Sequence, residues 1–157
     1  MSSHNLLFIF KDRKSVTLNH DFWIDKFQIK YNIFNFFIND KIQLSNNEII
    51  LEINKIILKE KIKIVLFEGD HAHIINDEFI SKVSKQVKKG IFLGDDMVWH
   101  LVNLISAQQC DFVLTSEPIS SYKFQEVGVK SLFVPIEANG KTFKERNCVM
   151  TFSFFKN

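Results

Sequence analysis

Short apolar runs alternate along the chain with amphipathic segments. Each run has four to six residues and is rich in β-branched or aromatic side chains, as in strands that are covered on both faces. This pattern predicts six strands, at Leu6–Phe10, Asn32–Phe37, Lys63–Phe67, Gly90–Leu93, Asp111–Thr115 and Ser131–Pro135.

The segments between these runs carry apolar residues at helical spacing. The clearest example is an isoleucine stripe from Ile49 to Ile57, whose members fall on one face of a helix. Ser45 and Glu48 stand at the start of this segment in the spacing of a capping box. The pattern predicts helices at Asp21–Gln28, Asn46–Lys61, Asn76–Val87, Met97–Gln109 and Pro118–Val127.

Regular alternation of strands and helices favours parallel strands that are joined by right-handed helical crossovers. We therefore predict an α/β fold, a Rossmann-like doubly wound parallel sheet of about six strands with helices on both faces. The pattern changes from Gly140 onward, where a charged stretch precedes Val149–Phe155. That last run is typical of a further strand, and no helical segment follows it.

Composition excludes several classes of function. A chain of 157 residues fits one ordinary domain, and 20 basic against 18 acidic residues give a net charge of only +2. Arg13 and Arg146 are the only arginines, so we expect no nucleic-acid partner. Two cysteines cannot form a disulfide framework, and no apolar run is long enough for a transmembrane segment. We therefore expect a cytoplasmic protein.

Ligands of open parallel sheets bind beyond the carboxyl ends of the strands. Five segments follow the predicted strands: Lys11–Lys14, Glu68–His71, Gly94–Asp96, Ser116–Glu117 and Glu137–Asn139. Taken together, they make this edge rich in acidic residues. The chain has no G-x-G-x-x-G fingerprint and no P-loop, so we expect no dinucleotide or other cofactor.

Two acidic clusters have alternative interpretations. Asp95 and Asp96 could hold Mg²⁺ with a phosphate, or one of them could cap the following helix, and their position before that helix favours the cap. Asp70, His71 and His73 make an incomplete zinc set, so we expect no metal there. Asp70 or His71 is better suited to contact a sugar hydroxyl or act as a general base, unless this is a solvent-facing loop.

The segment from Gly90 to Phe143 contains an ordered series of motifs. An acid pair at the end of a strand is followed by an aromatic residue, Trp99, near the start of a helix. Next come the strand Asp111–Ser116, a helix from Tyr122 to Gly128, and the residues Pro135, Ala138, Asn139 and Phe143. This series resembles the N-terminal half of GT-B glycosyltransferases, in particular the bacterial spore-protein glycosyltransferase-like family.

The resemblance implies the acceptor-side half of an enzyme that transfers a sugar from a nucleotide-sugar donor. Residues 1–143 would form its Rossmann-like domain, and residues 144–157 a linker and the first strand of a donor-binding domain. Its partner would be a sugar or glycan acceptor, with the nucleotide-sugar bound only where the second domain is present; alone we expect it to be inactive. Asp70 and His71 are the candidate catalytic residues, and the candidate substrate-binding residues are Asp95, Asp96, Trp99, Ser116, Glu117, Glu137 and Asn139.

Other interpretations stay open. The chain could be a stand-alone flavodoxin-like or receiver-like module that binds a small ligand or phosphate, or a purely structural remnant. The C-terminal run, with Phe152, Phe154 and Phe155, presents an apolar strand through which we expect self-association. Coding sequence for a second Rossmann-like segment downstream of Asn157 would separate the first interpretation from the others.

The acid pair can be tested by thermal unfolding. If one member caps a helix, its replacement by Ala lowers the free energy of unfolding by about 1 kcal/mol, whereas its replacement by Asn lowers it much less. If the pair binds Mg²⁺, millimolar Mg²⁺ raises the melting temperature and Asn abolishes the rise. We expect the cap, with the other carboxylate facing the acceptor. An Mg²⁺-dependent rise that disappears in Asp95→Asn or Asp96→Asn would overturn this expectation.

Overall fold

The computed structural model describes residues 4–11, 30–69, 74–94 and 96–134, with the backbone alone for 96–99. Its strands are β1 (His4–Phe10), β2 (Tyr31–Phe37), β3 (Ile62–Glu68), β4 (Lys88–Leu93), β5 (Phe112–Thr115) and β6 (Ser131–Phe133). Its helices are the short 3-10 helix η1 (Ile38–Lys41), α2 (Asn46–Lys59), α3 (Asp77–Lys82), α4 (Asp96–Ala107) and α5 (Pro118–Glu126).

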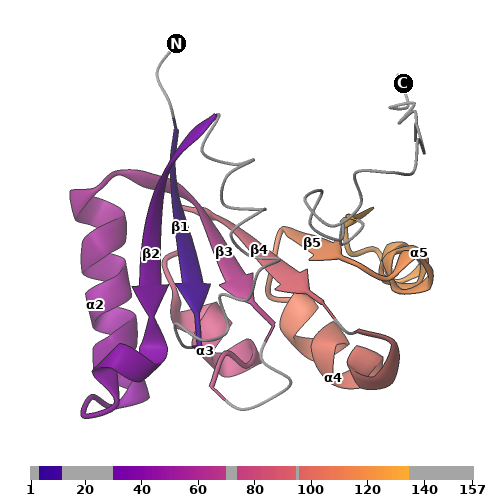
Figure 1. The fold of residues 1–157 in the computed structure, drawn as a ribbon, viewed down its shortest axis with the longest axis horizontal. Coiled ribbons are helices and arrows are strands. Elements are labelled where there is room, and N and C mark those ends of the chain that lie inside the picture. The colour runs from indigo at the N-terminus through magenta and orange to yellow at the C-terminus, as the bar shows by residue number, and fades with distance from the viewer. Residues whose placement is uncertain (1–3, 12–29, 70–73, 95, 135–157) are drawn as a thin grey trace, which may run out of the picture.

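The six strands form one parallel sheet in the order β2-β1-β3-β4-β5-β6 (Figure 1). The chain moves to one side of β1 to form β2, then returns to the other side and continues outward from β3 to β6. This reversal of direction is the mark of a doubly wound sheet. The predicted α/β Rossmann-like fold with about six parallel strands is confirmed.

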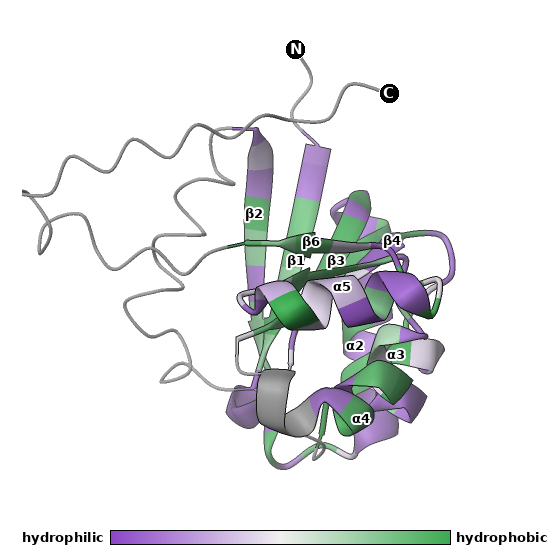
Figure 2. Ribbon diagram, turned by 90° about the vertical axis from the view of Figure 1, so that its right-hand side faces the viewer, coloured by the Kyte–Doolittle hydropathy of each residue, from purple (hydrophilic) through white to green (hydrophobic). Residues whose placement is uncertain are grey.

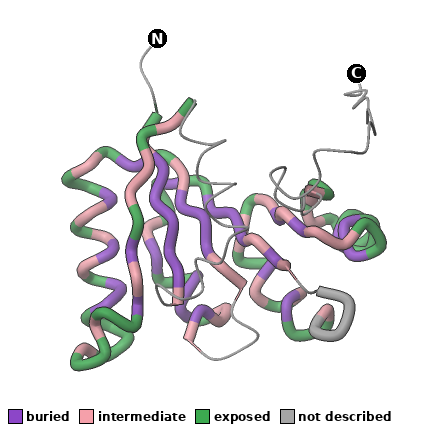
Figure 3. Tube along the Cα trace, viewed as in Figure 1, coloured by how far each residue is buried: buried purple, intermediate pink, exposed green. Residues whose placement is uncertain are grey.

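The main core lies between the sheet and a layer made by α2, α3, α4 and α5. Figure 2 shows these helices on the same side of the strands, and each one contacts the next along the chain. Ile53 of α2, Phe67 of β3, Ile80 of α3 and Phe124 of α5 are wholly buried here. The buried residues are concentrated on the central strands and on the inner faces of the helices (Figure 3).

The opposite face of the sheet carries a second apolar cluster. Leu6, Phe8, Phe10 and Leu66 are buried there, and the Phe10 ring stacks on both Phe8 and Phe37 with ring centroids 5.5 Å apart. None of the helices α2 to α5 contributes a described side chain to this cluster. Helices are therefore described on one face, and the helix predicted at 21–28 lies outside the described residues.

Helix α2 follows the sequence pattern closely. It begins at Asn46 as expected, and Ser45 and Glu48 form the predicted capping box, in which the Ser45 backbone N–H donates to a Glu48 carboxylate oxygen at 2.8 Å. Helix α5 begins with Pro118 and is followed by Gly128 with a φ of +81°, a left-handed conformation that suits glycine.

Three elements differ from their predictions. Helix α3 has six residues and ends at Lys82, whereas a helix was predicted as far as Val87. The Asn54 side chain of α2 accepts from the Ser84 backbone N–H at 2.9 Å, which favours a turn into β4 over further helix. Strand β6 is shorter than predicted, and β2 lies at the edge of the described sheet with two exposed asparagines, so it is not covered on both faces.

Gly90 of β4 leaves room for the Phe112 ring of β5 on the face of the sheet that carries the second apolar cluster. A Cβ at this position would lie 2.3 Å from two atoms of the Phe112 ring and 3.0 Å from Cδ1 of Leu66. The space where a side chain would stand is therefore filled by the ring, which packs against the second apolar cluster.

This close approach predicts the effect of adding one methyl group. Gly90→Ala should lower the free energy of unfolding by about 1–3 kcal/mol, because the Phe112 ring must move. Gly94→Ala is the matched control, since its Cβ would meet only Cε1 of Phe92, at an ordinary 3.8 Å. Urea denaturation of both variants measures the difference. Equal stability of Gly90→Ala and wild type would show that the contact is not tight.

Candidate functional site

All six described strands end at the same edge of the sheet, because they are parallel (Figure 1). Ligands of doubly wound sheets bind at this carboxyl edge, above all where the strand order reverses. In this sheet the reversal lies between β1 and β3. The residues that follow these two strands are therefore the first candidates for a ligand-binding site.

Glu68 is the described acidic residue at this reversal point. The Lys11 backbone N–H, just after β1, donates to Oε2 of Glu68 at the end of β3 over 3.1 Å. The Gly69 backbone N–H donates to the Phe92 carbonyl at 2.7 Å, and a Cβ on Gly69 would lie only 2.4 Å from Cδ2 of Leu93. The half-buried carboxylate of Glu68 is thus held in a fixed position in the middle of the edge.

Ser116 and Glu117 follow β5 and lie on the same edge. The Ser116 hydroxyl donates to the Gly94 carbonyl, and its backbone N–H donates to the Leu93 carbonyl at 3.2 Å. Ser116 therefore ties the segment after β5 to the segment after β4. Glu117 is the N-cap residue of α5, but its side chain makes no capping hydrogen bond. The Glu117 carboxylate therefore does not cap the helix.

The structure places only part of the set of candidate residues. Asp96 is the first residue of α4 and Trp99 lies in its first turn, both as backbone positions. Asp70, His71, Asp95, Glu137 and Asn139 lie outside the described residues, so their predicted roles stay predictions. Among the described residues, no three His, Cys, Asp or Glu side chains gather to hold a metal ion.

Asp111, from the motif that carries the resemblance, lies at the amino edge of the sheet. Its carboxylate accepts from the Lys89 backbone N–H at 2.8 Å and from Nζ of Lys88 at 2.9 Å. Burial alone would raise the pKa of Asp111, but these bonds and the two lysine charges hold it below its usual value. The residue joins β4 to the start of β5 and cannot reach the opposite edge, so its role is structural.

Lys89 and Cys110 occupy the same amino edge, beside a hollow of about 500 Å³. Lys89 is only 7% exposed, its Nζ donates to the Ile80 carbonyl at 2.8 Å, and burial lowers its pKa. Burial also raises the pKa of the Cys110 thiol to about 12. A thiol that stays protonated is a poor nucleophile. Cys110 is partly buried and packs against the main core.

The sequence places Glu68 in the acidic segment after the third strand, but Glu68 was not among the candidate site residues. A lone glutamate after an apolar run resembles any solvated strand end, and only the strand order shows that it stands where the sheet reverses. The chain matches no protein-family model and no curated protein. No helix in the described ranges is long and apolar enough to span a membrane.

The raised pKa of Cys110 predicts an alkaline loss of stability. The unfolded thiol ionises near its model value of 9.0 and the folded one only near 12, so between these values the folded state holds more protons. This contribution is present below pH 9 and is lost as the pH rises, by about 1.4 kcal/mol between pH 8 and pH 10.

Urea denaturation of wild type and Cys110→Ala at both pH values measures this loss. The variant should lose about 1.4 kcal/mol less than wild type over the interval. Identical pH profiles for the two proteins would contradict a buried, protonated thiol.

Proposed function

We propose that this chain is the acceptor-side domain of a GT-B glycosyltransferase. The observation that carries the proposal is the resemblance of Gly90–Phe143, whose described part folds as the unit β4-α4-β5-α5-β6. The motif positions at the ends of β4 and β5 fall on the carboxyl edge, which is the edge where such sheets bind ligands. The motif aspartate at the other end of β5 has a structural role, as described for Asp111.

Sugar transfer to a hydroxyl needs a group that removes the hydroxyl proton. Asp70 and His71 are the proposed candidates, because they follow Glu68 and Gly69 in the sequence and β3 borders the reversal point. Asp96 and Trp99 after β4, together with Glu117 after β5, are proposed to contact the acceptor. Carboxylates accept hydrogen bonds from sugar hydroxyls, and a Trp ring can stack on the apolar face of a sugar.

The charge of this edge favours an acceptor over a donor. Glu68 and Glu117 are acidic, and the sequence adds Asp70, Asp95 and Asp96 near the same strand ends. A nucleoside diphosphate carries negative charge, so these carboxylates would repel it unless cations intervened. A neutral sugar acceptor meets no such repulsion. In the proposed enzyme the diphosphate is bound by a separate donor domain, consistent with the two-domain GT-B architecture.

The strand order supports a second candidate. The order β2-β1-β3-β4-β5 is that of flavodoxin-like sheets, which bind a phosphate-bearing ligand at the β1/β3 reversal. A stand-alone phosphate-binding module is therefore the second proposal. The basic residues Lys11, Arg13 and Lys14 follow β1 in the sequence and, with or without Mg²⁺, would offset the carboxylate of Glu68.

Ligand binding by the purified chain distinguishes the two proposals. As an acceptor domain, it should bind members of a glycan array and should release no nucleotide from nucleotide-sugars above a protein-free control. Glu117→Gln should weaken glycan binding about tenfold, since one charge-assisted hydrogen bond is weakened. Glu126→Gln, at the exposed end of α5, removes an equal charge and should leave binding unchanged.

Two outcomes would count against the acceptor domain. Sugar transfer by the chain alone would show that it holds a complete active site. Binding of flavin mononucleotide or of acetyl phosphate with Mg²⁺, without any glycan binding, would favour the phosphate-binding module instead.

A further inference from the structure

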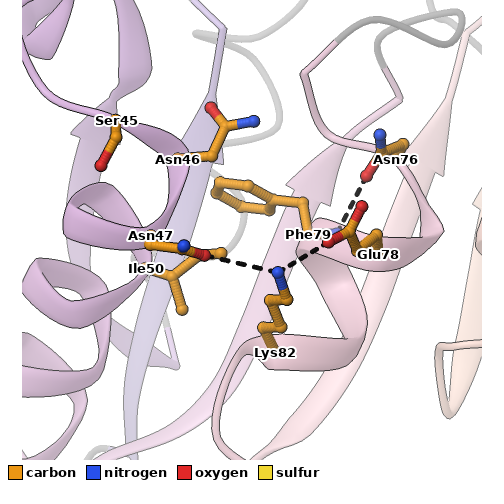
Figure 4. Close-up of a pocket in the computed structure, with 8 residues that line it drawn as sticks. All are labelled: Ser45, Asn46, Asn47, Ile50, Asn76, Glu78, Phe79 and Lys82. Carbon is orange, nitrogen blue, oxygen red and sulfur yellow. Dashed lines mark hydrogen bonds and ion pairs between the residues drawn. The ribbon is translucent and has the colours of Figure 1, made fainter.

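A polar hollow of about 220 Å³ lies between the first turns of α2 and α3 (Figure 4). Asn46 and Asn47 of α2 line one side, and Asn76, Glu78 and Lys82 line the other. Helix α2 starts soon after β2 ends and α3 soon after β3, so both first turns lie toward the carboxyl edge of the sheet. The hollow therefore stands at the ligand-binding edge, within the helix layer.

Lys82 holds the polar side chains of the hollow in place. Its Nζ donates to Oε1 of Glu78 at 2.7 Å and to Oδ1 of Asn47 at 3.3 Å, which joins the two helices. Asn76 is fixed as well, because its Oδ1 accepts from the Phe79 backbone N–H at 2.9 Å. Figure 4 shows Asn47 and Lys82 directed toward one another across the hollow, and Asn76 directed to the backbone of α3.

After these bonds are made, the side chains that line the hollow still offer both hydrogen-bond donors and hydrogen-bond acceptors. Asn47 and Asn76 each accept a bond through Oδ1, so their NH₂ groups remain as donors. Glu78 keeps its second carboxylate oxygen as an acceptor beside the Lys82 ammonium. A sugar hydroxyl both donates and accepts a hydrogen bond, so neighbouring hydroxyls match such an array.

The hollow is electrically neutral. The hydrogen bond from Lys82, together with its charge, lowers the pKa of Glu78, which favours the ionised carboxylate beside the lysine. Ser45 and Asn76 already accept from the backbone N–H groups of Glu48 and Phe79, so an anion would find those donors occupied. Neither a phosphate nor a free cation gains net attraction here.

The hollow is small and has a partly apolar lining. Ile50 and Phe79 line the hollow as its apolar members, and the Phe79 ring lies between the two helices (Figure 4). The volume is below the range of about 300–1,000 Å³ that is usual for drug-sized ligands, so it suits one small ring.

We propose that the hollow between α2 and α3 binds one neutral sugar ring, of the hexose type, through Asn47, Asn76, Glu78 and Lys82. This inference rests on the proposed function, because it assigns a subsite for a ring of the acceptor. The lining of the hollow includes no residue from the segments after β4 and β5, so a longer acceptor would place one ring here and present another at those segments.

Amide chemical-shift mapping of the full chain tests the subsite. Methyl glucoside, methyl galactoside and methyl mannoside are titrated separately, with inorganic phosphate as the charged control. At least one methyl hexoside should shift the side-chain NH₂ signals of Asn47 and Asn76, and phosphate should not. Asn47→Ala and Lys82→Met should each raise the Kd about tenfold, the effect of one lost hydrogen bond.

Lys55→Met is the matched control, because Lys55 is an exposed lysine of α2 that does not line the hollow. Its Kd should equal that of wild type, and unchanged amide spectra elsewhere will show that each variant is folded. If a hexoside shifts only signals near Ser116 and Glu117, the subsite is wrong while the proposed function survives. If no hexoside and no array glycan binds, both proposals fail; phosphate binding in the hollow overturns the subsite alone.

Discussion

The crossover between successive parallel strands is the constraint on which the rest of the structure depends. A parallel strand can follow another only after the chain has returned along the sheet, and α2 to α5 make that return on a single face. All strands then end at one edge, and the helices begin near it. The placement of Glu68, Ser116 and Glu117 follows from this constraint, as does the meeting of the first turns of α2 and α3.

The two edges of the sheet use their polar groups differently. At the amino edge, Asp111 ties β4 to β5 and Lys89 donates to the end of α3, so charged groups there are committed to internal bonds. At the carboxyl edge, Ser116 has a comparable structural bond, but Glu117 makes no capping bond. The apolar faces of the central strands supply the cohesion, since burial of one large side chain contributes roughly 1.5–3 kcal/mol. Polar groups at the carboxyl edge that the fold does not need for stability can therefore bind a ligand.

The sequence predicts the central strands β1, β3 and β4 well, because their apolar runs are mostly buried and this leaves a continuous signal. The start of α2 is equally clear, since Ser45 and Glu48 interact within one turn. The early end of α3 was not predictable, because it depends on Asn54, a residue of another helix. The hollow was missed for the same reason. Asn47 and Lys82 look like ordinary solvated helix positions, and their contact joins residues 35 positions apart in the chain.

Under the proposed function, the acidic edge and the neutral hollow would contact different parts of one acceptor. A carboxylate near a reacting hydroxyl can accept its proton, and a negative edge discourages a diphosphate from lying there without a cation. The opposite charges of Glu78 and Lys82 compensate each other, so this pair does not repel a ligand. It can therefore hold a sugar ring that does not react. A ring anchored in the hollow would restrict the position of its neighbour at the edge. Such fixed positioning lowers the entropy that must be lost when the hydroxyl meets the donor.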